Sequence, residues 1–165
     1  MQVIYILRLC PTSISEFLRH PLHTSSAASM VRLGLSMEGF YVNVLIVEDS
    51  AVIRDQLVTL LCGLDGVKIA GCAETEDEAV QLADTCAPDL VLLDISLRKG
   101  NGINVLRRLR TKNTPAPIIA MLTNMSDHYR LLTAELGADA YFDKTLQIDE
   151  ALHQIRHWAD YSLKA

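Results

Sequence analysis

The chain has 165 residues, of which half are apolar and about a fifth are charged, a composition typical of a globular protein with one core. Its formal net charge of −5 argues against a general electrostatic attraction to nucleic acid or to anionic lipid. No apolar run reaches the ~20 residues that a membrane helix needs, so we expect no membrane insertion and a cytoplasmic location.

Residues 1–41 lack the regular pattern of the rest of the chain. Pro and Ser are dense in this segment, as in linkers. Met30 and Met37 are internal methionines, and our hypothesis is that the working protein starts at or near Met37. Residues 1–41 would then be a disordered extension or the product of a start site assigned too early. An intact mass that requires residues 1–36 would reject the hypothesis that the start site was assigned too early.

A regular alternation of strands and helices begins at Val42. The predicted strands are short apolar runs, and the predicted helices have apolar residues at helical spacing. Ser50 is a suitable N-cap for the first helix, Thr75–Glu78 has capping-box spacing, and Ser126 is a suitable cap for the fourth helix. The strands are predicted at 42–47, 67–73, 90–93, 118–122 and 138–142. The helices are predicted to follow, with apolar stripes at 53–64, 79–86, 105–109 and 129–136 and a last helix at about 147–161.

Five strands that alternate with five helices predict an α/β fold of the (βα)₅ type. Right-handed crossovers and short loops favour one parallel, doubly wound sheet covered by helices on both faces. We expect the flavodoxin-like strand order 2-1-3-4-5. The domain is predicted to span residues 42–161, with a short tail at 162–165.

The four cysteines form no CxxC pair and have no matching histidine spacing, so no zinc site is expected. Three of them lie within apolar patterns, where cysteine behaves as a small hydrophobic residue. We therefore interpret these cysteines as reduced core residues. The four are Cys10, Cys62, Cys72 and Cys86.

Polar groups follow four of the five predicted strands at one edge of the sheet. They are Glu48 and Asp49 after the first strand, Asp94 after the third, Thr123 after the fourth and Lys144 after the fifth. In an open α/β sheet, ligands bind beyond the carboxyl ends of the strands. These side chains are therefore expected to lie close together.

Three carboxylates brought together repel one another unless a cation lies between them. Oxygen ligands without His or Cys suit a hard ion such as Mg²⁺ or Mn²⁺. A carboxylate nucleophile, a divalent ion, a lysine and a hydroxyl are the groups needed to form and hold an aspartyl phosphate. Simpler interpretations remain open: Asp94 as a turn cap, Glu48 and Asp49 as caps of the first helix, and Tyr141 as an ordinary strand aromatic.

Four motifs together resemble the receiver domain of bacterial two-component response regulators. They are VLIVEDS (44–50), LVLLDISL (90–97), IIAMLTN (118–124) and GADAYFDKT (137–145). The resemblance covers about residues 42–161. It implies a signalling domain, not an enzyme with its own substrate, that assists its own phosphoryl transfer and dephosphorylation with Mg²⁺ or Mn²⁺.

The resemblance also implies a role for each matching residue. Asp94 matches the phosphoacceptor, and Lys144 matches the lysine that pairs with the phosphoryl group. The metal would be bound by Asp49 directly, by Glu48 often through a water, by Asp94, and by the backbone carbonyl of Ser96. Thr123 matches the hydroxyl that engages the phosphoryl group, and Tyr141 matches the switch aromatic.

Two positions depart from the family pattern. The loop after Asp94 reads SLRKGNG and lacks the proline that many members carry there. Thr145 stands where many members have a proline in a cis turn, so the geometry of the Lys144–Thr145 peptide is left open. Neither departure removes a chemical group.

The partners implied are a histidine kinase or histidine phosphotransfer protein, a downstream target protein and, in some members, a second copy of the chain. Phosphorylation would repack the face made by the fourth helix, the fifth strand and the fifth helix. Two rival functions are a receiver-like interaction module that takes no phosphate, and a metal-dependent phosphatase with an aspartyl-phosphate intermediate. The second rival usually needs an acid two residues after the nucleophile, where this chain has Ser96.

Overall fold

The structure, a computed structural model, describes residues 41–112, 116–124 and 127–162. Within these residues five strands alternate with five helices. The strands are β1 (Val42–Val47), β2 (Val67–Ala73), β3 (Leu90–Leu93), β4 (Ile118–Thr123) and β5 (Ala140–Asp143). The helices are α2 (Ala51–Cys62), α3 (Glu76–Cys86), α4 (Gly102–Arg110), α5 (Asp127–Glu135) and α6 (Ile148–Ser162). The predicted extension up to residue 40, the cap Ser126 and the last three residues lie outside the described ranges.

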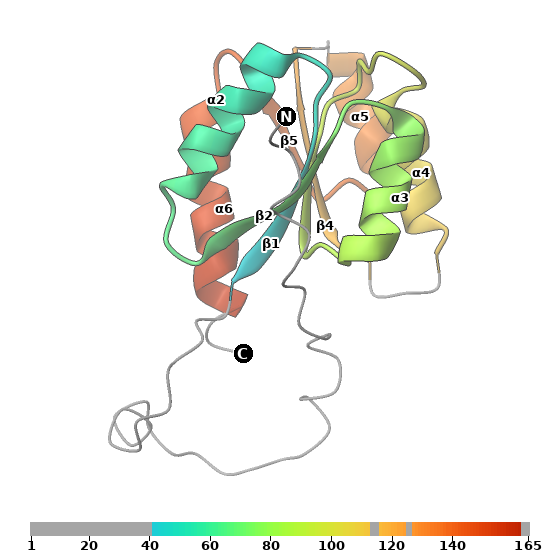
Figure 1. Cartoon of the computed structure of the whole chain (residues 1–165). Helices are drawn as coiled ribbons and strands as arrows, with labels where there is room; N and C mark the ends of the chain where they lie inside the picture. The colour runs from blue at the N-terminus through green and yellow to red at the C-terminus, as the bar shows by residue number, and fades with distance from the viewer. Residues whose placement is uncertain (1–40, 113–115, 125–126, 163–165) are drawn as a thin grey trace, which may run out of the picture. The chain divides into compact units, whose positions relative to one another are not determined.

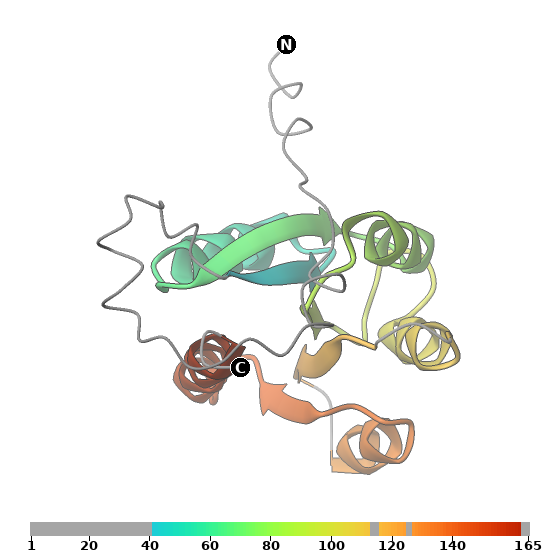
Figure 2. The ribbon, with the colours of Figure 1, turned by 90° about the horizontal axis from the view of Figure 1, so that it is seen from below.

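The strands form one parallel sheet in the order β2-β1-β3-β4-β5, which confirms the predicted flavodoxin-like order. Helices α2 and α6 cover one face of the sheet, and α3, α4 and α5 cover the other (Figures 1 and 2). Because β1 and β3 are neighbouring strands, the residues that follow them lie side by side. In the described part of the chain, no helix has both the length and the apolarity that crossing a membrane requires.

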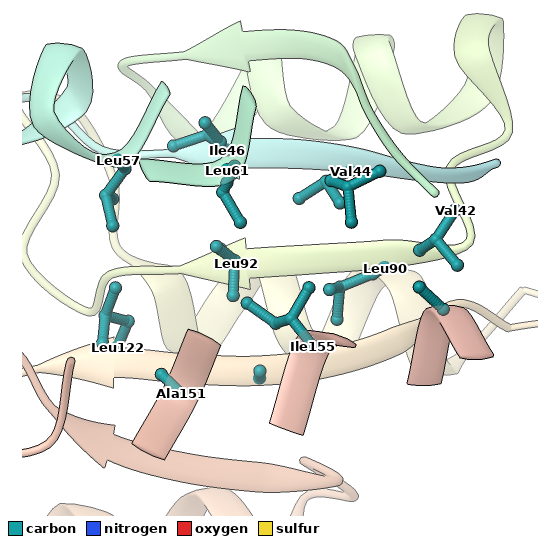
Figure 3. Close-up of a cluster of buried hydrophobic side chains, with 13 residues drawn as sticks. Val42, Val44, Ile46, Leu57, Leu61, Leu90, Leu92, Leu122, Ala151 and Ile155 are labelled. Carbon is teal, nitrogen blue, oxygen red and sulfur yellow. The ribbon is translucent and has the colours of Figure 1, made fainter. Parts of the chain in front are cut away.

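Alternate residues along each strand supply two separate hydrophobic cores, because successive strand side chains point to opposite faces. Val44, Ile46 and Leu92 pack with α2 and α6, as the close-up in Figure 3 shows. Leu45 and Val47 pack on the other face with α3 and α4. Both cores contain fully buried strand residues. The continuous apolar strands predicted from the sequence are therefore explained by burial on both faces.

Most predicted element ends are confirmed. Ser50 caps α2, and its hydroxyl accepts a hydrogen bond from the Ile53 N–H at 3.5 Å. Thr75 caps α3 in the same way through the Glu78 N–H. The last strand begins later than predicted, at Ala140, because the N–H of Ala138 still closes the end of α5 on the Thr133 carbonyl.

The interpretation of the cysteines as core residues is wrong for the three that the structure describes, and Cys10 lies outside the described residues. Cys62 and Cys72 are exposed, and Cys86 is only half-buried; all three are free thiols. Cys62 is the last residue of α2 and Cys72 lies on the edge strand β2. An apolar pattern in the sequence does not show whether a residue at the edge of the sheet or at the end of a helix is buried or exposed to solvent.

Arg110 ties α4 to the entrances of β4 and β5. Its guanidinium donates to the Gly137 carbonyl at 2.8 Å and to the Pro117 carbonyl at 2.7 Å, and it pairs with the Asp139 carboxylate at 2.5 Å. Asp139 in turn accepts a hydrogen bond from the Ile119 N–H at 2.7 Å. One planar side chain thus satisfies acceptors from two connections of the sheet.

Substituting Arg110→Lys is expected to lower the free energy of unfolding by about 1–2 kcal/mol, because one ammonium cannot replace three directed N–H groups. Urea unfolding followed by circular dichroism measures this change. Arg107→Lys is the matched control, since Arg107 is exposed in the same helical turn, and it should change stability by less than about 0.5 kcal/mol. Equal effects of the two substitutions would contradict the role given to Arg110.

Candidate phosphoryl and metal site

The acidic residues predicted to meet at the sheet edge do meet. Val47 of β1 is in register with Leu93 of β3, and the N–H of Asp94 donates to the Val47 carbonyl at 3.0 Å. One carboxylate oxygen from each of Glu48, Asp49 and Asp94 lies within 4.8 Å of the other two. Glu48 and Asp94 are buried, and Asp49 is the most open of the three. The cluster therefore offers oxygen ligands with one side toward solvent.

Lys144 supplies the positive charge next to two of these acids. Its Nζ atom lies 2.5 Å from Glu48 Oε2 and 2.9 Å from Asp94 Oδ2. The side chain of Lys144 is 10% exposed, that of Glu48 is 2% exposed and that of Asp94 is 6% exposed. A buried carboxylate is costly unless it is paired, and the same lysine pairs with both. Three carboxylates and one ammonium leave a formal charge of −2, which one divalent cation would balance.

Backbone groups hold the second oxygen of each buried carboxylate. Glu48 Oε1 accepts a hydrogen bond from the Ser50 N–H at 3.1 Å. Asp94 Oδ1 accepts one from the Ile95 N–H at 2.7 Å. Both oxygens of Glu48 therefore already have protein partners. The orientation of the two acids is fixed before any ligand arrives.

The loop after Asp94 is closed at its base by backbone pairing. Ser96 and Asn101 form an antiparallel bridge, and the N–H of Gly102 donates to the Ile95 carbonyl at 2.9 Å. A Cβ atom on Gly102 would lie 2.0 Å from the Asp94 carbonyl oxygen. Gly102 is thus a site residue that the sequence analysis missed. The signal available was a glycine as the first residue of the helix, since glycine allows another backbone to approach closely.

Thr123 and Tyr141 lie on the neighbouring strands. Thr123 is the last residue of β4 and is 1% exposed. Tyr141 is paired with Met121 in the sheet and is half-buried against the core that contains α3 and α4. Because Thr123 is two residues after Met121, the alternation of strand side chains places Thr123 and Tyr141 on the same face. Of the predicted site residues, side-chain contacts join Glu48, Asp94 and Lys144. The neighbouring strands and loop carry the other three, which are Ser96, Thr123 and Tyr141.

The model of the response regulator receiver domain family matches residues 44–156, which include every one of these site residues. The chain belongs to this family. Receiver domains are signalling domains of two-component systems, and the five-stranded parallel sheet in the order 2-1-3-4-5 is the fold that the resemblance implied.

In the curated relatives that match, the region similar to this chain is part of a longer protein. Transcriptional regulatory protein YdfI of Bacillus subtilis (strain 168) is 34% identical over 110 residues, which are 67% of this chain and 51% of the relative. The KDP operon transcriptional regulatory protein KdpE of Escherichia coli (strain K12) is 37% identical over 114 residues, covering 69% and 49%. The crystal structure of the BeF3-activated N-terminal receiver domain of Klebsiella pneumoniae RstA has a TM-score of 0.62 and 28% identity, covering 71% and 97%. The chain spans about half the length of the curated relatives it matches.

The peptide between Lys144 and Thr145 is trans, as are all peptide bonds of the described residues. The N–H of Thr145 donates to Asp143 Oδ1 at 2.8 Å, and the N–H of Leu146 donates to the same atom at 2.9 Å. A proline at position 145 could not make the first of these bonds. In this receiver domain, the Asp143 carboxylate therefore stabilises the turn after β5 by accepting a hydrogen bond from the Thr145 N–H.

Proposed function

We propose that this receiver domain takes a phosphoryl group onto the Asp94 carboxylate from a histidine of a kinase or phosphotransfer protein. The observation that carries the proposal is the contact of Lys144 with both Glu48 and Asp94 inside a buried acidic cluster. In the transfer, an Asp94 oxygen forms a bond to phosphorus while the phosphorus–nitrogen bond of the donor breaks. The electron pair stays on the donor imidazole, which then takes up a proton.

The position of each side chain supports the role proposed for it. Lys144 already contacts Asp94 Oδ2 and would pair with the oxygens of the phosphoryl group as it arrives. Thr123 would donate its hydroxyl to the phosphoryl group from the end of β4. The fixed orientation of Asp94 reduces the entropic cost of attack.

The donor set fits Mg²⁺ or Mn²⁺, because it consists of carboxylate oxygens with a net negative charge. Asp49 and Asp94 would bind the ion directly, with the backbone carbonyl of Ser96. Glu48, whose two oxygens are engaged by Ser50 and Lys144, would act through a water. Bound Mg²⁺ would neutralise charge on the phosphoryl oxygens and so assist both transfer to Asp94 and later hydrolysis.

Phosphorylation would change the face made by α5, β5 and α6. The hydroxyl of Thr123 would be drawn toward the phosphoryl group, and Tyr141, on the same face of the sheet, would move into the space vacated. This is a shift between two packings, driven by contacts that only the phosphorylated state makes. Four further points stay predictions: the downstream target, a second copy of the chain as partner, a cytoplasmic location and a working start near Met37.

The proposal is tested by incubating the full chain with acetyl phosphate and Mg²⁺ and measuring the intact mass. The wild type is expected to gain one phosphoryl group, and Asp94→Asn is expected to gain none. Asp65→Asn, at an exposed acid after α2, is the matched control and should be labelled like the wild type. Labelling of Asp94→Asn at the wild-type level would overturn the assignment.

Labelling, together with measurements of Mg²⁺ binding and of phosphate-monoester turnover, separates the two rival functions. A folded wild type that takes no label and binds no Mg²⁺ would instead be a receiver-like interaction module. Sustained turnover of a phosphate monoester would indicate a phosphatase. The position two residues after Asp94 is the exposed Ser96, so it offers no acid to protonate a leaving group.

A further inference from the structure

The loop between β3 and α4 is held by the connection between β2 and α3. The N–H of Glu76 donates to the Lys99 carbonyl at 3.0 Å, and the Glu76 carboxylate accepts from the Asn101 N–H at 3.3 Å. Gly100, between these two anchor points, has a φ of +77°, which favours glycine. The second half of the loop is therefore fixed by one acid at the start of α3.

A second acid holds the first half of the loop through a bridge of three charged side chains. Glu74 pairs with Arg98 of the loop through one carboxylate oxygen, and with Arg54 of α2 through the other at 3.2 Å. Arg54 also donates to the backbone carbonyl of Glu48 at 3.0 Å. Arg54 is largely buried, with 16% of its side chain exposed, whereas Arg98 is 60% exposed. The bridge thus runs from the backbone of an acidic-site residue to the tip of the loop.

We propose that the bridge Arg54–Glu74–Arg98 positions the two loops that carry the metal ligands, and thereby raises the affinity of the unphosphorylated protein for Mg²⁺. This inference rests on the proposed function. Arg98 follows Ser96, whose carbonyl is a proposed ligand, and Arg54 contacts the backbone of Glu48. Contacts of this kind, one step removed from the ion, orient the ligands and set metal affinity. Arg54, Glu74 and Arg98 are positioning residues, because they act through the loops.

The sign of one substitution separates positioning from simple electrostatics. Removing the positive charge of Arg98 would by itself strengthen the binding of a cation nearby. If Arg98 positions the loop, its removal weakens binding instead. Because Arg98 is a surface residue, we expect Arg98→Gln to weaken Mg²⁺ binding by about two- to fivefold.

The experiment is calorimetric titration of the unphosphorylated full chain with Mg²⁺. Lys99→Gln is the matched control: Lys99 is exposed in the same loop, and it is anchored through its backbone carbonyl. This control should bind Mg²⁺ as the wild type does or slightly more tightly. The double variant Arg98→Gln/Glu74→Gln should bind no more weakly than Glu74→Gln alone, because both changes break one bridge.

Hydrogen exchange without metal gives a second measurement. Amides of residues 96–99 should exchange faster in Arg98→Gln than in Lys99→Gln. If Arg98→Gln binds Mg²⁺ as tightly as the wild type or more tightly, the proposed role of the bridge is overturned and the proposed function is left intact. A wild type that binds no Mg²⁺ would overturn both, and failure of phosphorylation alone would leave the bridge standing.

Discussion

Substituting Lys144→Met is expected to lower the free energy of unfolding of the metal-free protein by about 3 kcal/mol. Methionine keeps much of the volume of lysine but removes the ammonium that contacts Glu48 and Asp94. Two buried carboxylates would then lie close together without that charge. Urea unfolding in the presence of a chelator measures the loss.

The matched control is Lys112→Met, which also removes a lysine from an ion pair. Lys112 pairs with Asp84 at the surface, where 30% and 58% of the two side chains are exposed, so its loss should cost less than about 1 kcal/mol. Added Mg²⁺ is expected to recover part of the stability of Lys144→Met, because the ion replaces the missing positive charge. Similar losses for both substitutions, or a loss that Mg²⁺ leaves unchanged, would contradict this role of Lys144.

Substituting Gly102→Ala is expected to destabilise the protein by about 2–3 kcal/mol and to slow phosphorylation of Asp94. The added Cβ would lie 2.0 Å from the Asp94 carbonyl oxygen and 2.9 Å from its carbonyl carbon. Backbone atoms cannot turn away as the end of a side chain can. Either α4 or the main chain of Asp94 must move, and both movements disturb the site.

Gly71→Ala is the control for the glycine substitution. A Cβ on Gly71 would meet the Leu82 side chain at 3.5 Å, an ordinary contact, so we expect a change within about 1 kcal/mol. Urea unfolding and the initial rate of labelling by acetyl phosphate measure both variants. A Gly102→Ala protein as stable and as reactive as Gly71→Ala would show that α4 can move away without cost.

The outline of the acidic site could be predicted because it follows from topology. In a parallel sheet the carboxyl ends of the strands meet at one edge, so Asp94 and Glu48 are neighbours once the strand order is known. Lys144 was placed there by the same rule, from the end of the fifth strand. The sequence pattern contains both the order of the elements and the residue type at each end.

Features that depend on close approach could not be predicted in this way. The contact of Gly102 with the Asp94 backbone arises from how α4 packs, and no periodicity encodes that distance. The sharing of Glu74 by two arginines depends on how far side chains reach from α2 and from the loop after β3. The exposure of Cys72 depends on β2 being an edge strand with one open side.

The contact between Lys144 and Glu48 joins residues that are 96 positions apart in the chain. Closing a loop of that length costs conformational entropy, and this cost grows slowly with the number of residues. During synthesis, both buried acids leave the ribosome well before the lysine that balances them. A chain whose fifth strand has not docked therefore has a charged, unpaired site. The pairing of Glu48 and Asp94 with Lys144 is therefore complete only once β5 has joined the sheet.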